Sequence, residues 1–184
     1  MGCKAAQLGP PEIMKAHSAG LVVYRLRASG PEVLVAHMGG PFHSKKDIGA
    51  WSIPKGLVEN DEEPLGTAKR EFAEELGLTA PEGDYFELGT IQQHNNKEVT
   101  AFAIEADIDV SNIKSNTFKL EWPPKSGKTQ EFPEIDRAAW LSLPDAAQKT
   151  VKGQAELFER LVNKLNVPFN SQATPGPPQQ KSLF

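Results

Sequence analysis

Residues 56–78 read GLVENDEEPLGTAKREFAEELGL and form the most informative stretch of the chain. Apolar side chains recur there at spacings of three and four residues, namely at Leu65, Ala68, Phe72 and Leu76, with Ala73 beside them. That spacing predicts an amphipathic helix with one apolar face. Pro64 suits the first turn, which needs no N–H donor there, and Gly77 suits the C-terminal end, where the backbone often turns left-handed.

Three carboxylates fall on another face of this predicted helix. Glu71, Glu74 and Glu75 stand at i, i+3 and i+4, so their side chains are neighbours. Like charges at this spacing destabilise a helix unless a cation offsets them, and hard divalent cations prefer oxygen ligands. Taken alone, the three residues fit a solvated acidic helix face better than a metal site.

The flanking residues reverse that preference. Gly56 is followed after five residues by Glu62 and after seven more by Arg70-Glu71, and an apolar residue, Glu74-Glu75 and Gly77-Leu78 complete the pattern. This arrangement matches the Nudix box at every fixed position, so the chain resembles the Nudix hydrolase family. The resemblance implies an α/β fold, a Nudix-type α/β/α sandwich with a mixed β-sheet.

The resemblance also implies a cofactor, Mg²⁺ or Mn²⁺. By position, Glu71, Glu74 and Glu75 would be its side-chain ligands, and Glu71 could also activate water. The main-chain carbonyl near Lys55 or Gly56 is a further candidate ligand.

Other acidic residues have candidate roles. Glu62 and Arg70 would form an ion pair that fixes the box loop against the helix, a role more structural than chemical. Some Nudix enzymes place the catalytic base on a loop after the sheet, and Glu131 or Glu134 could supply it here. Surface-loop acids are usually inert, so the location of the base stays open.

The sequence narrows the substrate only in part. Residues 51–56, WSIPKG, look like the segment before the box in diadenosine polyphosphate hydrolases and MutT-type enzymes, where Lys55 could hold a phosphate. The long segment 109–133 also resembles bacterial NTP pyrophosphohydrolases. In it, Trp122 could stack a base, and Lys125 and Lys128 could grip phosphate, or the aromatic residues could simply pack the segment down.

The remaining segments alternate between extended and helical patterns. Strands are expected at 19–27, 32–37, 85–93, 98–108, 117–122 and 136–141, with later helices at 143–150 and 153–165. We expect a disordered leader at 1–15, one Nudix domain at 16–166 and a Pro-rich disordered tail at 167–184.

Composition limits the class of protein. The 184 residues suit one domain, and the formal net charge of −4 argues weakly against a nucleic-acid partner. No apolar run is long enough to span a membrane. The single cysteine fits a reducing, cytoplasmic setting. Gly2-Cys3 could be acylated, but Ala6 departs from the myristoylation pattern, which favours an ordinary leader.

We therefore expect a metal-dependent hydrolase that cleaves a phosphoanhydride bond in an NTP or a diadenosine polyphosphate, a small nucleotide-type substrate. One alternative is a nucleoside diphosphate sugar hydrolase. Another is a non-catalytic Nudix-like sensor module that binds a nucleotide, although such modules typically lose box carboxylates and this chain keeps all of them. The sequence is compatible with a homodimer as well as a monomer.

Overall fold

The computed structural model describes residues 16–59, 61–93 and 97–166. The predictions of a disordered leader, with its N-terminal glycine and cysteine, and of a disordered tail lie outside these residues. In the described part of the chain, no helix is both long and apolar enough to cross a membrane.

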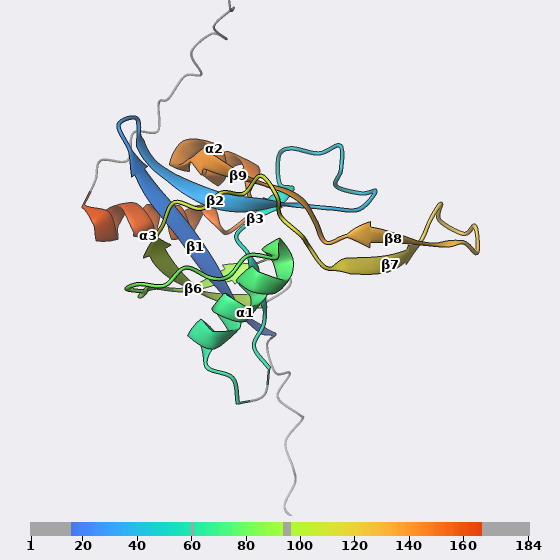
Figure 1. The fold of residues 1–184 in the computed structure, drawn as a ribbon, viewed down its shortest axis with the longest axis horizontal. Coiled ribbons are helices and arrows are strands. Elements are labelled where there is room, and N and C mark those ends of the chain that lie inside the picture. The colour runs from blue at the N-terminus through green and yellow to red at the C-terminus, as the bar shows by residue number, and fades with distance from the viewer. Residues whose placement is uncertain (1–15, 60, 94–96, 167–184) are drawn as a thin grey trace, which may run out of the picture.

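A mixed sheet forms the centre of the fold (Figure 1). Its seven strands are β1 (His17–Arg27), β2 (Gly30–Met38), β3 (Trp51–Ser52), β4 (Lys55–Leu57), β5 (Phe86–Gln93), β6 (Lys97–Glu105) and β9 (Ile135–Ser142). The main order is β3-β2-β1-β6-β5, and β4 pairs with β1 while β9 pairs with β2. The β1–β6 pair is parallel and the other pairs are antiparallel, which confirms the mixed sheet.

Helices cover both faces of this sheet. They are α1 (Pro64–Leu76), α2 (Leu143–Lys149) and α3 (Ala155–Leu165). Central strand β1 shows the two cores, because Leu21 and Val23 pack in the cluster that contains α1 residues. Val22 and Tyr24 belong to the opposite cluster, with α2 and α3. The predicted α/β/α sandwich is confirmed.

The α1 helix follows the predicted pattern with one exception. Ala68, Phe72 and Leu76 are fully buried against the sheet, whereas Ala73 is exposed. Gly77 ends the helix with φ of 65°, and its N–H donates to the carbonyl of Ala73. The buried stripe therefore fixes which face of α1 carries the carboxylates.

A two-stranded hairpin projects from the sandwich (Figure 1). It consists of β7 (Thr117–Glu121), which confirms the strand expected at 117–122, and β8 (Thr129–Pro133). The expectation that Glu131 lies on a loop was wrong, because it belongs to β8, which pairs in antiparallel register with β7, whereas Glu134 lies between β8 and β9. Short exposed strands such as β8 carry little apolar alternation, so their pairing with a neighbour defines them.

Candidate active site

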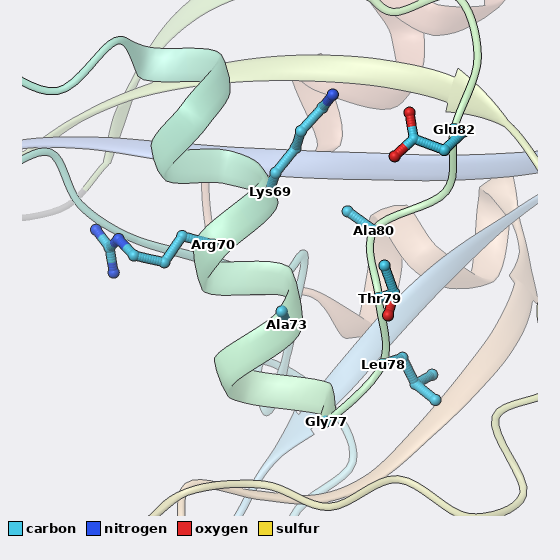
Figure 2. A pocket seen from close by; sticks show the side chains of 8 residues that line it. All are labelled: Lys69, Arg70, Ala73, Gly77, Leu78, Thr79, Ala80 and Glu82. Atoms are coloured by element: carbon cyan, nitrogen blue, oxygen red, sulfur yellow. The ribbon is translucent and has the colours of Figure 1, made fainter.

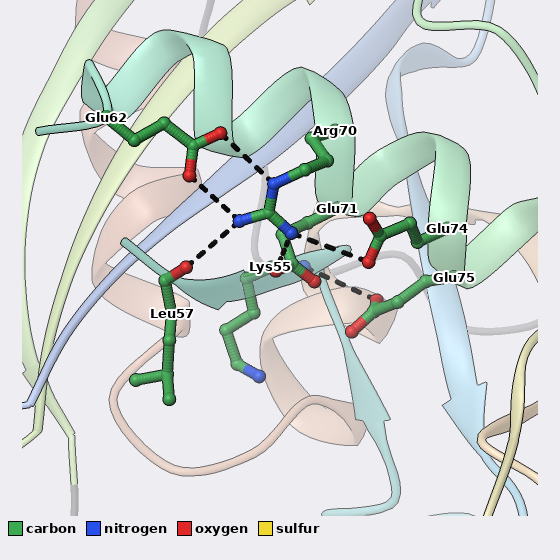
Figure 3. A network of polar contacts seen from close by, with 7 residues as sticks. All are labelled: Lys55, Leu57, Glu62, Arg70, Glu71, Glu74 and Glu75. Carbon is green, nitrogen blue, oxygen red and sulfur yellow. Dashed lines mark hydrogen bonds and ion pairs between the residues drawn. The ribbon is translucent and has the colours of Figure 1, made fainter. Parts of the chain in front are cut away.

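The box carboxylates gather where α1 packs on strand β4 (Figure 3). Glu71 lies against the strand backbone, since a Cβ built on Gly56 would be 2.0 Å from Glu71 Cδ. That distance is far below van der Waals contact, so only glycine leaves room for the carboxylate at this place. The first glycine of the box therefore brings the β4 backbone next to Glu71.

Arg70 links the box loop to the helix. Its Nε and Nη2 donate to the two carboxylate oxygens of Glu62 at 3.1 and 2.9 Å, and Nη2 also donates to the Leu57 carbonyl at 3.1 Å. The predicted Glu62–Arg70 ion pair is thus present in bidentate form. Hydrogen bonds from Arg70 lower the pKa of the Glu62 carboxyl to about 2. The same guanidinium donates to Glu71 at 2.7 Å and approaches Glu74 at 3.4 Å.

Glu75 has a different environment from its neighbours. Its Oε2 accepts a hydrogen bond from the Lys55 N–H at 3.3 Å (Figure 3). Burial raises the pKa of the Glu75 carboxyl to about 7, and the negative charges of Glu71 and Glu134 add to that rise, while Lys55 opposes it. The described protein groups therefore do not fully offset the negative charge of Glu75 when it is ionised.

The donor set fits a hard divalent cation in its chemistry. Carboxylates of Glu71, Glu74 and Glu75 with the nearby backbone of Gly56 offer only oxygen ligands, and a cation would offset the charge that raises the pKa of Glu75. In the described residues, no three acidic, histidine or cysteine side chains converge on one point. Instead, one guanidinium nitrogen of Arg70 donates to both Glu71 and Glu74.

The structure separates the two candidate bases beyond the box. Glu134 lies between β8 and β9, where its backbone N–H donates to the Asn116 carbonyl and its carbonyl accepts from Gly39 N–H. It is near enough for its charge to raise the pKa of Glu75. Glu131 lies on exposed β8, where its carboxylate accepts a hydrogen bond from the Thr117 hydroxyl. Of the two candidate bases, Glu134 is the one whose charge raises the pKa of a box carboxylate.

The other predicted substrate residues lie on the hairpin. Trp122 follows β7, and its ring meets Phe42 edge-on at a centroid distance of 5.3 Å. Lys125 and Lys128 occupy the connection between β7 and β8, which projects away from the sandwich (Figure 1). The structure does not bring these three residues together with Lys55, which starts β4 beside Glu75.

Two cavities flank the box. One, of about 520 Å³, lies between the C-terminal half of α1 and residues 78–82 (Figure 2), and its lining contains Arg70 but none of the three box carboxylates. The other has a volume of about 220 Å³ and is lined by Met38, Ser52, Lys55, Gln93, Lys97, Val151 and Lys152. Sequence reasoning found only Lys55 among these, because the others come from segments distant along the chain and carry no local motif.

Comparison with known proteins agrees with this geometry. A family model described as the NUDIX domain matches residues 14–161. An RNA pyrophosphohydrolase of Bartonella henselae is 25% identical over 133 residues, which are 65% of this chain and 72% of that protein. Two similar solved structures share the fold. The Ap4A hydrolase of C. elegans in a binary complex has a TM-score of 0.56 and 22% identity, over 81% of this chain and 98% of that one.

The second structure is the NUDIX domain of Shewanella oneidensis NrtR complexed with ADP ribose. It has a TM-score of 0.57 and 15% identity, and the match covers 85% of this chain and 94% of that chain. The family model spans most of the sequence, and its range contains the whole box and the sheet that supports it. The chain therefore belongs to the NUDIX family of hydrolases, as its resemblance to that family implied.

Proposed function

We propose that the protein is a divalent-metal-dependent pyrophosphohydrolase that cleaves a phosphoanhydride bond of a nucleoside di- or triphosphate derivative. NTPs and diadenosine polyphosphates are the foremost substrates. The observation that carries the proposal is the packing of the box, which sets the Glu71 carboxylate against the β4 backbone at Gly56 and the Glu75 carboxylate on the Lys55 N–H. The names of an RNA pyrophosphohydrolase relative and an Ap4A hydrolase neighbour support the same reaction class.

In this proposal Glu71, Glu74, Glu75 and the Gly56 carbonyl hold Mg²⁺ or Mn²⁺. When bound, such a cation would neutralise phosphate charge and lower the pKa of a coordinated water. Arg70 keeps Glu71 and Glu74 close to β4, and Glu62 fixes Arg70 in turn. Lys55 is the first residue of β4, and its backbone N–H donates to Glu75. Its ammonium group would hold a phosphate of the substrate beside the carboxylates.

We assign the general base to Glu134. The Glu71 carboxylate is already engaged by Arg70, whereas no hydrogen bond or ion pair of the Glu134 side chain occurs among the described residues. Glu134 would take a proton from the attacking water as the new O–P bond forms. The bridging P–O bond then breaks, and the second phosphate leaves with its electron pair.

The proposed setting is cytoplasmic, which the single cysteine supports. The test is product formation with Mg²⁺ or Mn²⁺ against a panel of nucleoside triphosphates, diadenosine polyphosphates, ADP-ribose, nucleotide sugars and an RNA carrying a 5′-triphosphate. Chromatography would resolve the products, with a chelator as the blank. Chelator-sensitive turnover of a phosphoanhydride supports the proposal. Nucleotide binding without turnover of any compound would instead indicate a sensor module.

A further inference from the structure

The smaller of the two cavities is distinguished by its charge. It brings the side chains of Lys55, Lys97 and Lys152 to one hollow, together with Ser52 and Gln93, and we call it the lysine pocket. In the part of the chain that the structure describes, no salt bridge engages any of the three lysines. Glu75 offsets part of the charge of Lys55, but none of the described lining residues is acidic, so the pocket favours an anionic occupant.

Gln93 contributes a second observation that points to a ligand. Its side-chain Nε2 is buried, yet it has no hydrogen-bond partner among the described residues. A buried donor without an acceptor destabilises a fold, and a bound ligand that supplies the acceptor is one explanation for such a group. An oxygen-rich ligand in the lysine pocket would supply the missing acceptor.

The walls of the pocket are firmly held. The buried side chain of Gln154 accepts from the Ile53 N–H at 3.0 Å and donates to Ser52 Oγ at 3.0 Å. Beside it, a Cβ on Gly153 would lie 3.0 Å from the Gln92 carbonyl, so the connection from α2 to α3 runs close along the end of β5. Backbone contacts of the neighbouring residues therefore fix the turn that carries Lys152 at the wall of the pocket.

The position and lining indicate which part of a nucleotide would bind here. None of the described residues that line the pocket is aromatic, and the three lysines among them match the charge of a phosphate chain. Lys55 belongs both to the pocket and to the carboxylate site, where its N–H donates to Glu75. A phosphate chain cut beside Glu75 would therefore continue into the lysines.

We propose that the lysine pocket binds the phosphates beyond the cleaved anhydride, and that the enzyme consequently selects substrates with three or more consecutive phosphates over nucleoside diphosphate sugars. This selectivity rests on the proposed function, but phosphate binding by the pocket does not require turnover. Lys97, Lys152 and Gln93 are the specificity-determining residues.

Binding is measured first, by calorimetric titration of inorganic tripolyphosphate and of pyrophosphate at about 0.15 M ionic strength with chelator present. We expect tripolyphosphate to bind the full-length protein more tightly than pyrophosphate. The double variant Lys97→Gln/Lys152→Gln should lose about tenfold or more of the tripolyphosphate affinity, because it removes two charges that exposed lysines contribute at roughly threefold or more each. Gln93→Leu should lose several-fold, since it removes a donor without orphaning another group.

Lys97 and Lys152 are exposed at the pocket, so a matched control is Lys119→Gln/Lys164→Gln, which removes the same charge from equally exposed positions outside the pocket, on β7 and α3. It should change the tripolyphosphate affinity by less than about twofold, as expected for screened surface charges. Equal losses in both double variants would show a general charge effect and overturn the pocket. So would a wild-type protein that fails to bind tripolyphosphate.

Kinetics then separates the two proposals. In the Lys97→Gln/Lys152→Gln variant, kcat/KM for a nucleoside triphosphate or a diadenosine polyphosphate should fall about tenfold or more, whereas kcat/KM for ADP-ribose should stay nearly constant. Equal losses for both kinds of substrate would overturn the proposed selectivity. Absence of turnover in the wild type would overturn the proposed function, and the binding titration would still decide the pocket.

Discussion

The α1 helix and the β7–β8 hairpin both present glutamates near one side of the sheet, but they hold them differently. Glu75 lies on a helix whose opposite face is fully buried through Phe72 and Leu76, and burial raises the pKa of its carboxyl to about 7. Glu131 lies on a hairpin whose backbone is largely exposed, where its partner is the Thr117 hydroxyl. The comparison of these two glutamates indicates that packing, which removes water from a carboxyl group, is what raises its pKa.

The two regions meet at Glu134. Backbone hydrogen bonds to Asn116 and Gly39 fix this residue at the base of the hairpin, and its charge contributes to the raised pKa of Glu75. Within the hairpin the rings of Phe118 and Phe132 lie 6.1 Å apart, and Trp122, which follows β7, contacts Phe42 outside it. The comparison suggests that the hairpin serves the site through its base rather than through its tip.

The largest expected effect is that of Glu75→Gln. Because metal-ion catalysis contributes several kcal/mol, the variant should lose about a thousandfold or more in kcat. Glutamine has nearly the same volume, so the melting temperature should not fall. Steady-state kinetics and thermal unfolding check the two statements, and unchanged kcat would remove the metal-site assignment.

Glu134→Gln should come next. As the proposed general base, Glu134 should contribute about a hundredfold to kcat, the lower end for this type of catalysis. The matched variant Glu131→Gln should stay within about twofold of wild type, since the structure shows it only in contact with Thr117. If Glu131→Gln shows the larger loss, the tip rather than the base of the hairpin takes part in the reaction.

Gly56→Ala should have an intermediate effect. The new Cβ would overlap the Glu71 carboxylate, which lies at the end of a flexible side chain and would shift away. We expect kcat/KM to fall about tenfold, because small misplacements of catalytic groups are costly. The control is Gly66→Ala, where no atom lies within 4 Å of the new Cβ. It should retain activity and stabilise α1 by about 0.5–1 kcal/mol.

The smallest effect concerns stability and depends on pH. The pKa of Glu62 is lowered to about 2 by Arg70, from an ordinary value of 4.5. Its ion pair therefore stabilises the fold above about pH 4.5, and this contribution is lost as the pH falls toward 2. Glu62→Gln should lower the melting temperature modestly at pH 7 and less at pH 3. An equal loss at both pH values would show that the charge of Glu62 is not the cause.

The sequence predicted the helix of the box but not the short strands around it. The α1 helix and its carboxylate face follow from local spacing between Pro64 and Gly77, so both were predictable. Strands β4 and β8 were not, because short strands are defined by the neighbours with which they pair. The charge of Glu134 reaches Glu75 only because the chain turns between β8 and β9. No local sequence pattern predicted that turn.

The lysine pocket is the feature that the sequence predicted least. Lys97 and Lys152 stand in unremarkable local sequence, and each reads as a solvated charge. They meet Lys55 only because β6 pairs with β1 and because Val151 N–H donates to the Trp51 carbonyl. Such a site arises from tertiary contacts, so it becomes visible only in the folded chain.

Metal binding by the box is the central claim, and titration with Mn²⁺ followed by electron paramagnetic resonance tests it most directly. The free-ion signal should fall as wild-type protein is added, and Glu75→Gln should weaken this binding about tenfold or more. Glu131→Gln should bind as the wild type does. Equal Mn²⁺ affinity in wild type and Glu75→Gln would contradict the assignment of α1 as the metal site.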